Sequence, residues 1–208
     1  MQTLKPNGLL KKLAALAADP AVDLWSSDEC HFQQHGSRCV MWVPPEERDP
    51  VLRHEPTRKS LALFGAVNLH GGQMHALFCE PFDGDSFIEF LRTLLRRRSK
   101  RRQLVVIADN AAYHKSPPVR SFVAEHSSQM QVVYLPPYSP ELNPIERVWK
   151  LTRRLCTHNR YFPELAMLRD AVAEQLRAWW RPNETLRRLC CITYCLVLSI
   201  DNTVCLEE

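Results

Sequence analysis

Three acidic residues stand beside expected secondary-structure elements that are far apart in the sequence. Asp28 closes a candidate strand that begins at Val22, Asp109 follows the apolar run Leu104–Ala108, and Glu146 follows the dipeptide Asn143-Pro144. Carboxylates held on separate rigid elements can share hard divalent cations, and a pair of such cations can drive an in-line phosphodiester displacement. The pattern therefore predicts metal-dependent cutting and joining of DNA strands, with Asp28, Asp109 and Glu146 as catalytic metal ligands.

Each of these acids also has a purely structural explanation. Asp109-Asn110 is a residue pair that favours turns, and Asp28 could be an ordinary loop residue. With Asn143-Pro144 at the start of a helix, Glu146 would complete a capping box, a role that needs no catalysis. Glu29 would point to the opposite face of a strand from Asp28, so these two cannot both face one metal pair.

The order of the expected elements predicts an α/β fold with a mixed central sheet flanked by helices. Early strands joined by short turns must be mostly antiparallel, whereas the second half alternates between helices and buried strands. No glycine-rich phosphate loop is present, which excludes a dinucleotide-binding fold. The expected elements are a lead-in helix over 9–17; strands at 22–28, 31–42, 60–69, 74–79, 103–109 and 130–135; and helices from Asp83 or Asp85, over 116–126, from Asn143 and over 162–180.

Length and composition fit one soluble domain with appendages. The chain has 208 residues and a net charge of +4, and its eight cysteines include no Cys-x-x-Cys pair, so a structural zinc site is not expected. The domain division expected is a lead-in over 1–19, a catalytic domain over 20–182 and a helical tail over 183–208. The start shows no secretory signal, and the apolar run 190–200 is too short to span a bilayer, which predicts an intracellular protein with reduced thiols.

Positive charge is concentrated in two stretches. One run lies between Glu89 and Asp109, and the other lies between Glu146 and Glu164. Such patches suit a polyanionic partner, although each could also be a solvated helix face. The basic residues of these stretches are Arg92, Arg96, Arg97, Arg98, Lys100, Arg101 and Arg102 in the first, and Arg147, Lys150, Arg153, Arg154 and Arg160 in the second.

Three segments resemble the Tc/mariner superfamily of DDE transposases, most closely its bacterial insertion-sequence branch. The segment Leu135–Lys150 resembles the third-acid segment of that family, and Ile107–Ser116 is similar to its second-acid segment. Asp28-Glu29 together with Trp42-Val43-Pro44 is similar to the first. The similarity covers about residues 20–180, and 36 residues (110–145) separate Asp109 from Glu146, within the short spacing of this superfamily.

The resemblance implies a ribonuclease H-like fold with Asp28, Asp109 and Glu146 binding Mg²⁺ or Mn²⁺, two ions per site. It also implies DNA as the partner, both transposon ends and target, and a homodimer acting across two ends. The residues expected to contact DNA are Arg147, Lys150, Arg153, Arg154, His114 and Lys115. Only about twenty residues precede the first expected strand, so a helix-turn-helix reader of DNA ends would be a separate subunit or reading frame. A bacterial, cytoplasmic, nucleoid-associated protein is expected.

Two other functions remain open from the sequence. A ribonuclease H-like nuclease that cuts but does not join strands would share the fold and the metals. An inactive DNA-binding remnant of a transposase would keep the acids only as structural residues.

Overall fold

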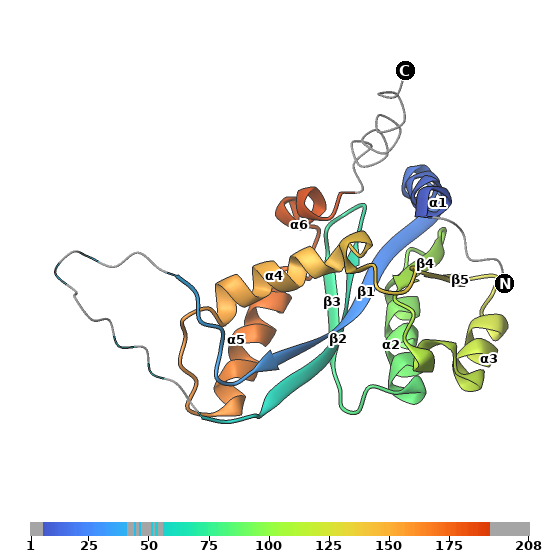
Figure 1. The fold of residues 1–208 in the computed structure, drawn as a ribbon. Helices are drawn as coiled ribbons and strands as arrows, with labels where there is room; N and C mark the ends of the chain where they lie inside the picture. Colours follow the sequence, from blue (N-terminus) through green and yellow to red (C-terminus); the bar gives the residue numbers. More distant parts are fainter. Residues whose placement is uncertain are drawn as a thin grey trace, which may run out of the picture.

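The computed structural model describes residues 6–40, 44, 46, 51, 53 and 56–191. Its centre is a five-stranded sheet in the order β3-β2-β1-β4-β5 (Figure 1). The strands pair antiparallel from β3 to β1 and parallel from β1 to β5, so the sheet is mixed as predicted. The strands are β1 (Val22–Gln33), β2 (Ser60–Asn68), β3 (Met74–Phe78), β4 (Gln103–Ala108) and β5 (Met130–Tyr134).

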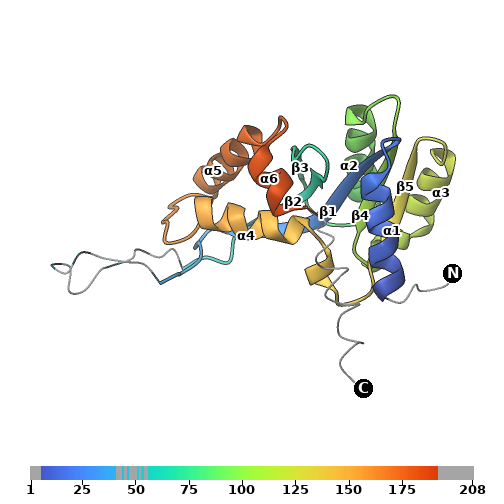
Figure 2. The same cartoon turned by 90° about the horizontal axis from the view of Figure 1, so that it is seen from above.

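Helices cover both faces of this sheet. Viewed from above, α2 (Gly84–Arg97) and α3 (Pro117–Glu125) lie on one side, while α4 (Ile145–Cys156), α5 (Leu165–Ala178) and α6 (Glu184–Leu189) lie on the other (Figure 2). The lead-in helix α1 (Pro6–Ala18) buries Leu9 and Leu13 in the same core as α4 and α5. The sheet thus separates two apolar layers, as expected for a mixed sheet whose strands are buried on both faces. None of the helices in the described part of the chain is long and apolar enough to cross a bilayer.

The helix α2 begins as the sequence predicts. Asp83 is its N-cap, and its side chain accepts a hydrogen bond from the backbone N–H of Ser86 at 2.8 Å. The hydroxyl of Ser86 in turn accepts from the backbone N–H of Asp83 at 2.9 Å, which completes a capping box. The helices α3 and α5 lie within the predicted ranges, and each is shorter than predicted.

The prediction of two separate early strands is wrong. The structure has one strand, β1, that runs through Asp28 to Gln33, so Asp28 lies inside a strand and not at its end. The cause is an unbroken antiparallel register with β2, from Trp25 opposite Asn68 to Gln33 opposite Ser60. The remainder of the predicted second strand includes residues 41 and 42, which fall outside the described residues.

On its other side, β1 is paired for only part of its length. Its parallel pairing with β4 runs from Val22 opposite Gln103 to Ser26 opposite Ile107 and ends there. Asp28 and Asp109 each lie two residues beyond this last pair, so the two strands bring both carboxylates to the same level of the sheet. The point where β1 and β4 separate is therefore where the cleft opens.

Candidate active site

The three predicted acids line one cleft. Asp28 comes from β1, Asp109 from the end of β4, and Glu146 from the first turn of α4, and all three border a cavity of about 460 Å³. The proline-rich segment before α4 forms the other side of this cavity, with Tyr138 fully exposed at its rim in a left-handed backbone conformation (φ 55°). The remaining lining residues are Asn110, Ala111, Leu135, Pro136, Pro137, Ser139, Pro140 and Asn143.

Glu146 is not a capping residue. The side chain of Asn143 does not cap α4, because its amide is bonded to β1: Oδ1 accepts from the Ser26 hydroxyl at 2.5 Å, and Nδ2 donates to the carbonyl of Ser27 at 3.1 Å. The hydroxyl of Ser26 accepts from the backbone N–H of Ile145 at 3.1 Å, and so binds the first helical turn itself. The alternative explanation of Glu146 as part of a capping box is therefore wrong, and these bonds instead fix the start of α4, and with it Glu146, beside β1.

A glycine in β2 makes room for the group that orients Asp28. Gly65 pairs with Asp28, and a Cβ atom at Gly65 would lie 2.3 Å from the indole of Trp149. Because there is no side chain at this position, Trp149 of α4 packs directly on β2 and is almost completely buried. Its Nε1–H donates to Oδ2 of Asp28 at 3.2 Å.

His114 joins Asp109 to Glu29. It lies in the short 3-10 helix η1 (Ala112–Lys115), and its ring is buried. Its Nδ1 is 2.9 Å from Oδ1 of Asp109, and its Nε2 is 2.8 Å from Oε1 of Glu29. The hydroxyl of Tyr113 donates to the same oxygen of Glu29. Glu29 thus lies with Tyr113 and His114, away from Trp149 and Asp28, which agrees with the predicted alternation of β1.

The electrostatics of the cleft favour a cation. Burial, and then the negative charges of Glu29, Glu146 and Asp109, raise the pKa of Asp28 to about 8. The pairing with His114 lowers the pKa of Asp109 below its usual range. Burial alone would lower the pKa of His114, but its pairing with Asp109 and Glu29 outweighs burial and raises that pKa to about 9.

The residues present fit a hard divalent metal. Carboxylate oxygens are the ligands that Mg²⁺ and Mn²⁺ prefer, and all three acids of the cleft offer them. The amide oxygen of Asn110, another lining residue, is buried without a hydrogen-bond partner among the described residues. A divalent cation would neutralise the charge that otherwise holds Asp28 protonated, so the set of donors and its electrostatics agree.

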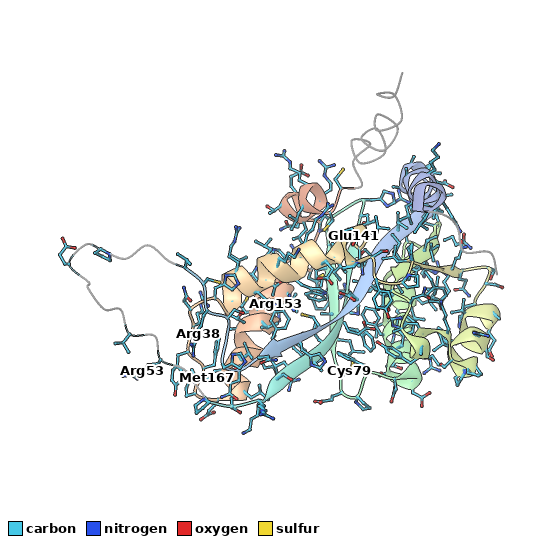
Figure 3. All side chains as sticks on the ribbon, in the orientation of Figure 1. Arg38, Arg53, Cys79, Glu141, Arg153 and Met167 are labelled. Carbon is cyan, nitrogen blue, oxygen red and sulfur yellow. The ribbon has the colours of Figure 1, made fainter. Side chains whose placement is uncertain are left out.

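The residues predicted to contact DNA differ in their surroundings. On α4, Lys150 and Arg154 are exposed, at four and eight residues after Glu146, whereas Arg147 donates to the carbonyl of Leu189 at 3.0 Å. Arg153, labelled in Figure 3, lies 3.1 Å from the sulfur of Cys30 and over the ring of Phe32. Lys150 and Arg154 are therefore the exposed ones among the predicted DNA contacts of α4, the helix that carries Glu146.

The two residues of η1 that were predicted to contact DNA also differ in their exposure. Lys115 is partly exposed, with its ammonium group 4.8 Å from the ring centre of Tyr134. His114 is 1% exposed and bound on both ring nitrogens, so its environment argues against the predicted contact with DNA.

Comparison with known proteins decides the family. Residues 23–169 match the family model described as DDE superfamily endonuclease. The chain belongs to this family. The DDE domain is 31% identical over 117 residues to an uncharacterized protein of Sinorhizobium fredii, y4pE/y4sA, covering 56% of this chain and 81% of that protein. It is 29% identical over 97 residues to an uncharacterized 39 kDa protein of insertion element IS630 from Shigella sonnei, covering 47% of this chain and 28% of that protein.

Solved structures share the fold of this DDE domain. The Mos1 strand transfer complex superposes with a TM-score of 0.66 at 18% identity, covering 94% of this chain and 57% of that chain. The Mos1 mariner paired end complex with Mn gives the same score, over 94% and 58% of the two chains. The predicted ribonuclease H-like fold is thereby confirmed, and the family match confirms the predicted DDE endonuclease family. The DDE domain spans little more than half of the Mos1 chain, and 28% of the insertion-element protein.

Sequence reasoning found the three acids that line the cleft but not the residues that hold them. Gly65 was the available signal for Trp149, because an isolated glycine in an apolar strand often marks a close approach by another group. The bridge through His114 had no comparable signal. It depends on the turn of η1, which brings a side chain from after β4 against the side chain of Glu29 on β1.

Proposed function

We propose that this chain is the catalytic domain of a transposase, which cleaves a DNA strand and then joins the freed 3′ end to a second DNA. The observation that carries this proposal is the convergence of Asp28, Asp109 and Glu146 on one cleft from three separate elements. Membership of the DDE endonuclease family and the relationship to an insertion-element protein support it.

The chain's own residues would hold the metal and orient the DNA. Asp28, fixed by Trp149, and Asp109, fixed by His114, would bind from the sheet, and Glu146 would bind from α4. The metal, Mg²⁺ or Mn²⁺ with two ions per site, would activate the attacking oxygen and stabilise the leaving one. Lys150 and Arg154, exposed on the same helix as Glu146, would hold phosphates beside the cleft.

The same acids serve both steps. Water attacks the phosphodiester first, which breaks one P–O bond and releases a 3′-hydroxyl. That hydroxyl then attacks a phosphodiester of the second DNA, so one P–O bond forms as another breaks. Neither step needs a covalent enzyme intermediate. The wider expectations belong to the same proposal: a homodimer across two transposon ends, a separate helix-turn-helix subunit, and a place at the bacterial nucleoid.

A strand-transfer assay tests the reaction. The purified chain is given labelled DNA with a pre-cut 3′ end, together with a supercoiled plasmid, in Mg²⁺ or in Mn²⁺. We expect nicking of DNA and joining of the labelled end, and we expect both to stop in excess EDTA. Full activity in EDTA contradicts the metal mechanism. Nicking without joining identifies a nuclease, and binding without either reaction identifies an inactive remnant.

The variant Glu146→Gln tests the acid from α4. It removes one metal-binding charge and keeps the size of the side chain, so melting within a few degrees of wild type is expected. Cleavage should fall at least about a hundredfold, which corresponds to about 3 kcal/mol of barrier.

Glu141→Gln is the matched control for this substitution. Glu141 is exposed, lies five residues earlier in η2 (Pro140–Leu142), and does not line the cleft (Figure 3). The Glu141→Gln variant should cut DNA normally. Near-normal cleavage by Glu146→Gln would remove Glu146 from the site.

A further inference from the structure

The arrangement around His114 points to a role for a residue that does not face the cleft. The ring has 1% of its surface exposed and lies between carboxylates from two different elements, Glu29 on β1 and Asp109 after β4. Phe87 of α2 packs on the ring with its centroid 4.0 Å away, and Tyr113 lies 4.4 Å away on centroids. The ring is therefore held by packing as well as by its two polar contacts.

Both ring nitrogens face acceptors. A carboxylate only accepts hydrogen bonds, and His114 faces a carboxylate oxygen at 2.9 Å on Nδ1 and at 2.8 Å on Nε2. Neither ring N–H is aligned with its oxygen well enough to count as a hydrogen bond, so the ring is held by two close polar contacts. The bridge therefore ties β1 to the segment after β4, at the level where these two strands have already separated.

A metal ion held by this same trio is a weaker interpretation. Oxygens of Glu29 and Asp109 and a nitrogen of His114 lie within 4.8 Å of one another. Ligands of a common tetrahedral ion would lie about 3.3 Å apart, given metal–ligand bonds of about 2.0–2.1 Å. The observed contacts of 2.8 and 2.9 Å are shorter and fit direct contact between the ring and the two carboxylates.

The bridge determines which oxygen of Asp109 is left for a metal. Oδ1 is already engaged by His114 and by the backbone N–H of Ala111 at 3.0 Å. The carboxylate is thereby held in one rotation, with Oδ2 left to bind a cation in the cleft. Partners of this kind orient a metal ligand without touching the metal, and their loss lowers metal affinity by about 10–100-fold.

We propose that His114, backed by Glu29, is a positioning residue that fixes Asp109 for metal binding. This inference rests on the proposed function, because it assigns Asp109 to the metal site. It also gives Glu29 a function, although that carboxylate does not line the cleft. Tyr113 completes the set by donating to Glu29 from the same turn.

Binding of Mn²⁺ to the DNA-free protein tests the inference, by calorimetry or by the electron paramagnetic resonance of free Mn²⁺. His114→Gln can contact only one of the two carboxylates, and its Kd for Mn²⁺ should rise about 10–100-fold. Glu29→Gln should also weaken Mn²⁺ binding, because Glu29 holds the His114 ring that contacts Asp109. The double variant should bind no more weakly than His114→Gln alone, because the two residues act as one unit.

Phe90→Leu is the matched control for a loss of packing. Phe90 lies in the same apolar layer, and its ring packs on Phe64 and His75 and not on His114. Its melting temperature should fall, while its Kd for Mn²⁺ should stay within about threefold of wild type. Equal weakening by Phe90→Leu and His114→Gln would mean that stability alone controls metal binding, and it would overturn the inference.

A second measurement needs no metal. In the metal-free protein, the NMR signals of the His114 ring should shift in Glu29→Gln, because that change alters the contact at Nε2. Unshifted signals, wild-type Mn²⁺ affinity in His114→Gln, or a wild-type chain that binds no Mn²⁺ at millimolar concentration overturns the inference. If Mn²⁺ binding depends on His114 but DNA is neither cut nor joined, the positioning role stands and the proposed reaction fails.

Discussion

The metal-free protein favours a protonated Asp28, whereas a bound metal would favour its ionised form. Burial and three neighbouring carboxylates raise its pKa to about 8 from an ordinary value of 3.8, so at neutral pH the metal-free site keeps it protonated. In the unfolded chain the same group ionises near its ordinary value. Between these two values the folded state binds the extra proton, so stability falls as the pH rises.

The variant Asp28→Asn should remove this penalty. The amide oxygen can still accept from Trp149, and no charge has to be suppressed. In EDTA we expect Asp28→Asn to melt at a higher temperature than wild type at pH 8, with the difference shrinking toward pH 4. The measurement is thermal unfolding from pH 4 to pH 9. Parallel pH profiles for the two proteins would contradict the electrostatic explanation.

The same variant should lose its response to metal. Added Mg²⁺ should raise the melting temperature of wild type, because the ion binds the folded state and offsets the repulsion. Asp28→Asn should gain little. A site residue that destabilises the metal-free fold is thus expected to improve stability and abolish activity when it is replaced.

At the scale of elements, Gly65 lets α4 and β2 approach each other closely. Gly65→Ala would place a methyl group 2.3 Å from Trp149, whose buried indole has no open space to move into. We expect a loss of about 1–3 kcal/mol in stability, as for other overpacked cores, and slower cleavage, because the indole would leave Asp28. Urea unfolding and a cleavage assay measure the two effects.

Gly71→Ala is the control for the element-scale prediction. Its added methyl group would meet the end of the flexible Gln73 side chain, which can move aside. The change should therefore cost little in stability and nothing in cleavage. If Gly65→Ala cut DNA as well as Gly71→Ala does, the indole would not be what orients Asp28.

Periodicity and turn chemistry predicted most elements well, because these signals are local. Asp83 marked the start of α2, and the apolar run before Asp109 marked β4. The errors lay where long-range contacts override local preference. Pairing with β2 carries β1 straight through Asp28, and Ser26 draws Asn143 away from the cap that local rules assign to it.

The candidate site, like the fold, could be predicted from the sequence only in part. The resemblance placed Asp28, Asp109 and Glu146, and the structure brings them to one cleft. The roles of Trp149 and His114 depend on side chains that meet across the sheet and across a turn, which no spacing in the sequence specifies. Local sequence therefore identified the acids but not the groups that hold them in position.

At the scale of the whole molecule, the two basic stretches lie at different ends of the sheet. Lys150 and Arg154 are exposed on the helix that carries Glu146. Arg101 and Arg102 are exposed just before β4, whose opposite end leads to Asp109. Six residues of strand, about 20 Å at about 3.3 Å per residue, separate them from the cleft.

Salt titrations of DNA binding should separate these two surfaces. The double variant Lys150→Ala, Arg154→Ala removes two phosphate contacts, so the slope of log K against log salt should fall by about two, and cleavage of a short duplex should weaken. The matched pair Arg101→Ala, Arg102→Ala should cut that duplex normally. Identical behaviour of the two pairs would mean that the basic stretches act only through net charge.

The bond between Ser26 and Asn143 spans 117 positions, and it secures the start of α4 to the first strand. A ribosome therefore releases Asp28 and Asp109 well before Glu146, and the cleft lacks one wall until α4 has emerged and docked. If the three acids act together as proposed, an unfinished chain cannot nick the genome from which it is being expressed. Late delivery of the third acid would then protect the host through the order of synthesis alone.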